Sequence, residues 1–275
     1  GDCLDELGLG AWFQNYFLLP MGGAIWSMPV TEMLKFPACA FIRFFENHGL
    51  LTIDDHPQWY TVRGGSRAYV QRLIEPFQDR IHLECTVKKV WRDTHGVVVE
   101  NADGHQAIYD DVVFACHADQ ALSMIQNPST HEEKILSAFR YQSNRAVLHS
   151  DTSFMPKRRK AWASWLYLSE GKQEENPCIS LSYWMNNLQP LQTKQPLMVT
   201  LNPGREPNPK LVYNDHLFEH PIFDAAAIYS QSEIDAIQGH NHLWFCGAYL
   251  RYGFHEDGLD SAVRMTQRMG IEPSW

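Results

Sequence analysis

The residues best suited to chemistry lie near the C-terminus, in the stretch 244–269. An apolar run at 243–246 predicts a buried strand, and Gly247 then opens a loop rich in Gly, Tyr and His. The loop leads into a helix that begins near Asp257-Gly258. Because the N–H groups and the dipole of a helix N-terminus attract negative charge, the pattern predicts an anion site. An ordinary strand, turn and helix in an α/β core explains it equally well.

Residues 1–58 are predicted to be mainly helical. Aromatic residues recur at helical spacing from Trp12 and stop at Pro20. In the small-residue segment 21–29, two glycines beside Trp26 allow close approach by another helix or by a flat ligand. The next helix is expected to start at Thr31. We interpret these aromatic residues mainly as core, with some of them lining a substrate pocket.

The middle of the chain carries the clearest strand and turn signals. Gly64-Gly65 forms a turn into a helix, with Ser66 as its expected N-cap. Turn residues at 93–96 and 102–104 separate three predicted antiparallel strands, and the continuous apolar run 112–116 is typical of a parallel sheet. The predicted strands are 59–62, 81–87, its continuation into a second strand at 87–91, 97–100, 106–109 and 112–116, with helices at 67–77 and 117–125.

A second sheet is expected between residues 126 and 235. Its predicted elements are a helix from His131, strands at 141–149, 161–165, 179–184 and 197–201, a charged hairpin loop at 171–176 and a proline-rich turn at 202–209. We expect one face of this sheet to carry Trp162, Trp165, Tyr183 and Trp184. Such a face either forms the floor of a pocket or packs against the N-terminal helices.

Composition excludes several classes of partner. A net charge of -9 over 275 residues argues against nucleic acid as the main partner. The basic run 157–160 indicates a solvated loop, with a binding patch as the alternative. No apolar run approaches 18 residues, so no transmembrane segment is expected. Six scattered cysteines indicate reduced thiols and a cytoplasmic protein. His240 and His242 are the closest metal-like pair, and no metal site is predicted.

Five strings carry a specific resemblance that covers essentially the whole chain. They are LLPMGGAIWS at 18–27, VRGGSRAYV at 62–70, VVFACHADQAL at 112–122, YWMNNLQ at 183–189 and GAYLRYGFHEDGL at 247–259. The sequence resembles the flavin amine oxidase and phytoene desaturase superfamily. Within it, the chain is most similar to FAD-dependent amine-oxidase-like proteins, described as predicted NAD/FAD-binding proteins and related to the N-terminal domain of plant cyclopropane-fatty-acid synthases.

The resemblance implies a mixed α/β fold with α+β character. It predicts an incomplete FAD-binding Rossmann-like domain with a β-meander, and a substrate domain of antiparallel sheet and helices. Family members open with a strand, a G-x-G-x-x-G turn and a helix. Here Gly8 and Gly10 follow no strand, and Phe13 holds the sixth position. We therefore expect a truncated chain without that segment. The implied domains are 1–58 (helical part of the substrate domain), 59–125 (FAD-binding part with the meander), 126–235 (substrate-domain sheet) and 236–275 (C-terminal FAD-binding strand and helix).

The resemblance also implies which residues meet the cofactor FAD. Those expected to bind it are Val87, Gly64, Gly65, Gly247, Glu256, Asp257 and Gly258. Candidates to line the space beside the flavin are Trp26, Tyr249, Tyr252 and His255, and among these His255 is a candidate proton acceptor.

Two functions are compatible with these observations. The first is an FAD-dependent, amine-oxidase-like oxidoreductase that acts on an apolar or lipid-like small molecule. The second is a flavin-free remnant that binds a lipid or a partner protein. Missing strands would leave an open sheet edge, which favours a homodimer.

Overall fold

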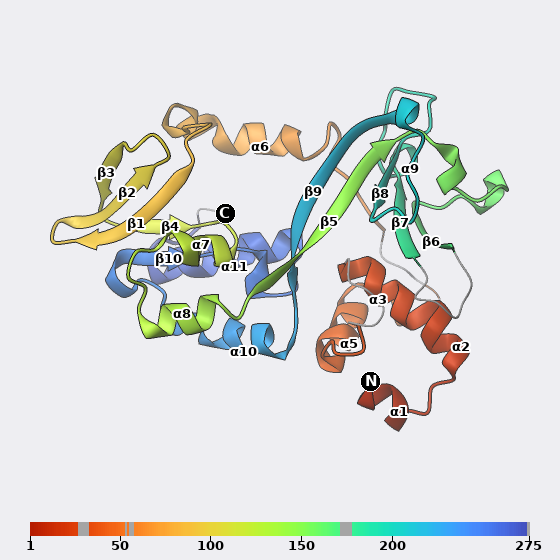
Figure 1. The fold of residues 1–275 in the computed structure, drawn as a ribbon, viewed down its shortest axis with the longest axis horizontal. Helices are drawn as coiled ribbons and strands as arrows, with labels where there is room; N and C mark the ends of the chain where they lie inside the picture. The colour runs from red at the N-terminus through yellow and green to blue at the C-terminus, as the bar shows by residue number, and fades with distance from the viewer. Residues whose placement is uncertain (27–32, 53, 55–57, 171–177, 274–275) are drawn as a thin grey trace. The chain divides into compact units, whose positions relative to one another are not determined.

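The computed structural model describes residues 1–26, 33–52, 54, 58–170 and 178–273. Within them the chain forms two compact units, each assembled from two stretches of sequence (Figure 1). Unit 1 comprises residues 1–80 and 142–220, and unit 2 comprises residues 81–141 and 221–275. The predicted mixture of helices and antiparallel sheets is confirmed. The assignment of segments to cofactor and substrate domains stays a prediction.

Unit 1 begins with an uncharged helical run from Ala11 to Trp26. The predicted stop at Pro20 is wrong, because Pro20 lies within the first turn of α3 (Leu19–Trp26). A π-helical turn (Gln14–Leu18) precedes α3, and the N–H of Leu19 donates to the carbonyl of Gln14. This wider turn lets the chain accommodate a proline that has no N–H to donate. The other helices of unit 1 are α1 (Asp2–Glu6), α2 (Ala11–Phe13), α5 (Ala38–Asn47), α6 (Ser66–Ile74) and α9 (Met185–Leu188), with 3₁₀ turns at Glu75–Arg80, Thr152–Phe154, Arg159–Ala161 and Pro209–Leu211.

An aromatic cluster holds α3 against α5. The Trp26 ring is 4.4 Å from the Phe36 ring and 5.0 Å from the Phe44 ring, and Trp26 is buried. A Cβ atom added to Gly22 would lie 2.8 Å from the ring of Phe41. Gly22 therefore permits the close helix approach that the sequence predicted.

Unit 1 also contains a five-stranded sheet in the order β6-β7-β8-β5-β9 (Figure 1). Its strands are β5 (Arg140–His149), β6 (Trp165–Glu170), β7 (Cys178–Trp184), β8 (Met198–Leu201) and β9 (Val212–Ile222). Strand β9 was not predicted. It is an edge strand whose side chains are largely exposed, and Asp215, Glu219 and Pro221 interrupt any apolar alternation.

The prediction of a single aromatic sheet face is wrong. Trp165 and Tyr183 are cross-strand partners, with ring centroids 5.5 Å apart. Trp184 follows Tyr183 directly, and successive side chains of a strand point to opposite faces. Trp184 instead packs edge-on against Trp162, at a centroid distance of 5.2 Å.

The buried face of the sheet carries a row of polar side chains. His149 Nε2 is 2.7 Å from Thr200 Oγ1, which is 2.7 Å from Ser182 Oγ. The backbone N–H of Asp151 donates to His149 Nδ1. Because Nδ1 accepts, Nε2 carries the proton of a neutral ring. Burial lowers the pKa of His149, so the neutral ring is also the favoured form.

Unit 2 contains the predicted meander and a separate parallel pair of strands. The meander consists of β1 (Val87–Asp93), β2 (Gly96–Asn101) and β3 (Gln106–Tyr109), paired antiparallel. Strands β4 (Val112–Phe114) and β10 (Leu243–Phe245) pair in parallel. The helices are α7 (Ala118–Met124), α8 (Thr130–Leu136), α10 (Ala225–Glu233) and α11 (His255–Arg268), with 3₁₀ turns at Ile234–Ala236, His240–His242 and Ala248–Leu250.

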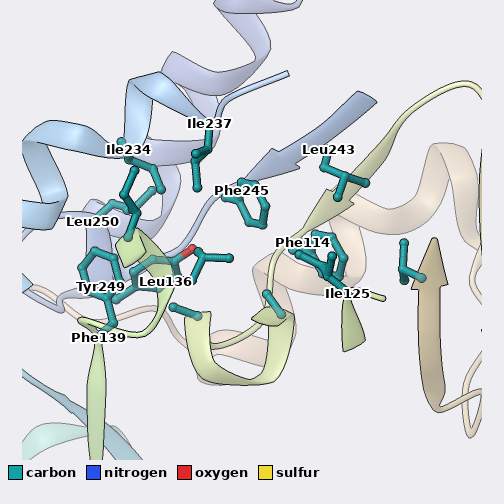
Figure 2. Packing of buried hydrophobic residues seen from close by; sticks show 14 of the residues in the cluster. Phe114, Ile125, Leu136, Phe139, Ile234, Ile237, Leu243, Phe245, Tyr249 and Leu250 are labelled. Carbon is teal, nitrogen blue, oxygen red and sulfur yellow. The ribbon is translucent and has the colours of Figure 1, made fainter. Parts of the chain in front are cut away.

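The core of unit 2 forms around the parallel pair (Figure 2). The Phe114 and Phe245 rings, one from each strand, stack with centroids 5.4 Å apart. Leu136 from the end of α8, Phe139 from just beyond that helix and Ile237 from beyond α10 complete this part of the cluster. The packing fixes the parallel pair relative to its helices.

Several element boundaries differ from the prediction. Residues 59–62 and 81–86 form no strand, and β6 starts only at Trp165. Residues 59–62 have the composition of a strand, but no strand of the described structure lies beside them to form hydrogen bonds. Gly65, rather than Ser66, is the N-cap of α6. The predicted loop at 171–176 and the predicted helix start at Thr31 lie outside the described residues.

Candidate functional site

The parallel strands of unit 2 end at the same edge and each leads into a helix. Strand β4 continues through Cys116 to α7, and β10 continues through Gly247 to α11. In open sheets with parallel strands, ligands bind beyond the carboxyl ends of the strands. We therefore take this edge as the candidate site.

A buried serine fastens the glycine turn to α11. The N–H of Gly247 donates to Ser261 Oγ over 2.9 Å, and the Ser261 hydroxyl donates to the carbonyl oxygen of Gly258 over 2.7 Å. A Cβ atom added to Gly258 would lie 3.8 Å from the nitrogen of Ala248. Gly258 thus presents bare backbone beside the turn. Sequence reasoning missed Ser261 because its bond to Gly247, 14 residues away in the chain, depends on tertiary contact and leaves no periodic signal.

Tyr249 fixes the same turn from the core side. A Cβ atom on Gly247 would lie 2.6 Å from the Tyr249 ring, so the ring requires glycine there. The ring packs edge-on against Phe139 at 4.8 Å and is only 3% exposed. Figure 2 shows its hydroxyl inside the apolar cluster, where no described residue bonds to it. Burial raises the pKa of Tyr249 well above its usual value, so the phenol stays neutral.

Two glutamine side chains satisfy backbone groups around the turn. Gln238 donates to the carbonyl oxygen of Phe245 over 2.6 Å and accepts from the N–H of Phe245 over 2.9 Å. Gln231 donates to the carbonyl oxygen of Tyr249 over 2.9 Å. The turn is therefore pre-organised by side chains that the sequence pattern did not single out.

The first turn of α11 places carboxylates at the candidate site. His255, its first residue, and Glu256 are exposed. Asp257 is buried and accepts the N–H of Phe254 over 2.9 Å. Asp257 therefore closes the start of its own helix, whereas the Glu256 carboxylate faces solvent.

The other predicted site residues are divided between the units. In unit 2, Val87 begins β1 opposite Asn101 and packs against the core cluster that contains Tyr249. In unit 1, Gly64 and Gly65 adopt φ values of +87° and +74° and begin α6, and Trp26 lies in the aromatic cluster. Unit 2 thus contains Val87, Gly247, Tyr249, Tyr252 and the segment 255–258, whereas Gly64, Gly65 and Trp26 belong to unit 1.

Neither a metal cluster nor a membrane span is found in the described part of the chain. No three His, Cys, Asp or Glu side chains there converge on one point. His242 Nδ1 instead lies 3.3 Å from Asp111 Oδ1. No described helix combines the length and apolarity needed to cross a bilayer.

Comparison with known proteins gives a family-level match. The sequence profile described as flavin containing amine oxidoreductase matches residues 2–210. No match was found among curated proteins.

Solved structures give likeness of fold at low sequence identity. A UDP-galactopyranose mutase in its reduced form has a TM-score of 0.60 and 13% identity, covering 95% of this chain and 66% of that one. Cyclohexylamine oxidase from Brevibacterium oxydans has a TM-score of 0.53 and 11% identity, and the match covers 86% of this chain and 61% of the oxidase. A fatty acid isomerase from P. acnes that produces CLA has a TM-score of 0.51 and 11% identity, and the match covers 75% of this chain and 52% of the isomerase. The chain thus spans about half the length of that isomerase.

Proposed function

We propose that this chain, which belongs to the flavin containing amine oxidoreductase family, supports flavin-dependent oxidation of an apolar or lipid-like small molecule. The observation that carries the proposal is the turn at Gly247, which Ser261 fastens to α11 at the carboxyl edge of the parallel strands. A rigid backbone edge of this kind suits a flat, extended cofactor. When bound, FAD would supply the two-electron acceptor.

The donor and acceptor chemistry at this edge fits the ribityl and ring part of FAD. The bare backbone at Gly258 leaves room for an extended chain beside Ala248. Glu256 offers an exposed acceptor for the hydroxyl groups of a polyol. Two acidic residues in one helical turn suit hydroxyl donors better than a diphosphate, which carries the same sign of charge. We therefore propose Gly247, Glu256 and Gly258 as contacts for the ribityl side.

The remaining candidates take supporting roles in the proposal. Val87 would meet the adenine through its backbone, and Gly64 and Gly65 would lie near the cofactor. Asp257 holds the helix start through Phe254 rather than through the ligand. The roles of Val87, Gly64 and Gly65 derive from the family resemblance.

The catalytic candidates have different environments. His255 is exposed at the start of α11, where a neutral imidazole can accept a proton from a substrate. Tyr249 is buried beneath the turn, so we assign it a positioning role. Trp26 is enclosed by aromatic rings of unit 1 and would shape apolar walls rather than exchange protons.

An apolar substrate is supported by the chain's aromatic content and by one structural neighbour. Trp26, Phe36 and Phe44 form part of a large aromatic cluster in unit 1. The fatty acid isomerase has a related fold and acts on a fatty acid, whereas the mutase acts on a sugar nucleotide. A comparison of a fatty acid, an apolar amine and a sugar nucleotide, each tested for flavin reduction, would identify the class. Reduction by the sugar nucleotide alone would overturn the apolar proposal.

Gly258→Ala separates cofactor binding from folding. The added Cβ makes an ordinary 3.8 Å contact with Ala248, and alanine in place of a helical glycine stabilises by about 0.5–1 kcal/mol. We expect equal or higher stability in urea unfolding, together with weaker FAD uptake measured by flavin absorbance and fluorescence quenching. Glu256→Gln should also weaken FAD uptake, whereas the exposed Glu133→Gln serves as its matched control.

Wild-type protein that takes up no FAD on reconstitution would refute the flavin proposal. The flavin-free alternative, a lipid-binding or protein-interaction module, would then be favoured. If FAD binds but neither Gly258→Ala nor Glu256→Gln weakens it, FAD binding stands and the assigned contacts are wrong.

A further inference from the structure

A basic and aromatic segment of unit 1 has no role in the proposed chemistry. Residues 157–165 read KRRKAWASW; they contain the 3₁₀ turn at Arg159–Ala161 and end at Trp165, the first residue of β6. Lys157, Arg158 and Lys160 are exposed, and no acidic side chain of the described chain pairs with them. In a protein of net charge -9, this is a local concentration of unneutralised positive charge.

Arg159 ties the basic run to indole rings. Its guanidinium carbon lies 3.6 Å from the centroid of Trp162 and 4.6 Å from the centroid of Trp184. Trp162 Nε1 in turn donates to the carbonyl oxygen of Pro156 over 2.8 Å. Trp165, three residues further on, remains 45% exposed. Arg159 and Trp162 pack on the side of Trp184, whereas Trp165 packs on the side of Tyr183. Because β6 is an edge strand, the anchored segment carries the cations and the exposed indole around one edge of the sheet.

We propose that the segment 157–165 docks on the surface of an anionic lipid bilayer. Exposed lysine and arginine are attracted to acidic headgroups, and a half-exposed indole suits the boundary between headgroups and acyl chains. The charge complementarity is local, because the rest of the chain carries excess negative charge that anionic surfaces repel.

The geometry favours lipid over nucleic acid as the occupant. Single-stranded nucleic acids bind aromatic side chains by stacking bases on open ring faces. Arg159 already covers a face of Trp162, and Trp165 is packed against Tyr183 at an interplanar angle of 78°. The proposal goes beyond the proposed function and does not require flavin to be bound.

The test is co-sedimentation of the full chain with vesicles of phosphatidylcholine alone and of phosphatidylcholine mixed with phosphatidylglycerol. We expect binding only to the anionic vesicles, and weaker binding as salt rises. The triple variant K157Q/R158Q/K160Q leaves the Arg159–Trp162 contact in place. It should bind roughly 100-fold more weakly, since each cation near such a surface contributes about a fivefold factor. Trp165→Ser should weaken binding at low and at high salt.

A charge-matched control distinguishes vesicle binding through the segment 157–165 from an effect of the protein's total charge. K88Q/K134Q/K210Q removes the same three charges from exposed sites elsewhere, and it should retain more than half of wild-type binding. Loss of binding in this control equal to that of the patch variant would overturn the proposal. So would equal binding to neutral and anionic vesicles, or tighter binding to a single-stranded oligonucleotide than to anionic vesicles.

Discussion

Substitution of Ser261 by alanine tests whether the glycine turn depends on a single hydroxyl. The Gly247 N–H would lose its acceptor, and Gly258 would lose a donor to its carbonyl. A buried donor left unsatisfied costs about 1–3 kcal/mol, and Ser261 is 3% exposed. Because Gly247 itself is only partly buried, we expect the lower part of that range, about 1–2 kcal/mol of unfolding free energy.

Ser123→Ala is the matched control for this experiment. The Ser123 hydroxyl also donates to a carbonyl three residues earlier on a helix, over 2.7 Å, but it is exposed and accepts no turn N–H. We expect less than about 0.5 kcal/mol for the control. The free energies come from urea unfolding, and hydrogen exchange of peptides spanning 244–250 gives a local reading. Equal free-energy losses in the two variants, or unchanged exchange at the turn, would refute the reasoning.

Three further predictions concern buried polar groups. Tyr249→Phe should stabilise the protein by about 1 kcal/mol, since it removes a buried hydroxyl without a partner; a lower urea midpoint would contradict this. The lowered pKa of His149 means that the unfolded state takes up a proton first as pH falls below about 6.5. Stability should therefore decline on acidification, and His149→Asn should decline less in urea titrations near pH 7.5 and pH 5. Glu132→Ala should cost about 3 kcal/mol or more, because it leaves Arg92 unpaired and removes the acceptor for the N–H of Ser129; a loss below about 1 kcal/mol in urea unfolding would rule this out.

Local patterns predicted the elements whose signals are local. The meander follows from turn residues at 93–96 and 102–104, and the parallel pair follows from short apolar runs with flanking glycine and aspartate. Strand β9 escaped prediction because an exposed edge strand needs no apolar alternation. Pro20 led to the opposite error. The sequence predicted that the helix ends there, whereas a preceding π-helical turn lets the helix continue through the proline.

The candidate site was predicted only in part, for a different reason. Glycines and acidic residues at 247 and 256–258 stand out in the sequence, because the turn and the helix start demand them. Ser261, Gln231 and Gln238 act through hydrogen bonds to backbone 7 to 18 residues away in the chain, and any exposed helix could carry the same residue types. Such contacts become visible only when the chain is folded.

The amide of Gln238 has a consequence for how the parallel pair can be extended. It occupies the N–H and carbonyl of Phe245, and the N–H of Gly239 occupies the carbonyl of Leu243. The side of β10 that faces away from β4 is therefore already saturated, as if a short strand were present. The side open to a further strand is that of β4, which has β10 as its one strand neighbour in the described structure. The Gln238 side chain therefore determines on which side of the parallel pair another strand can be added.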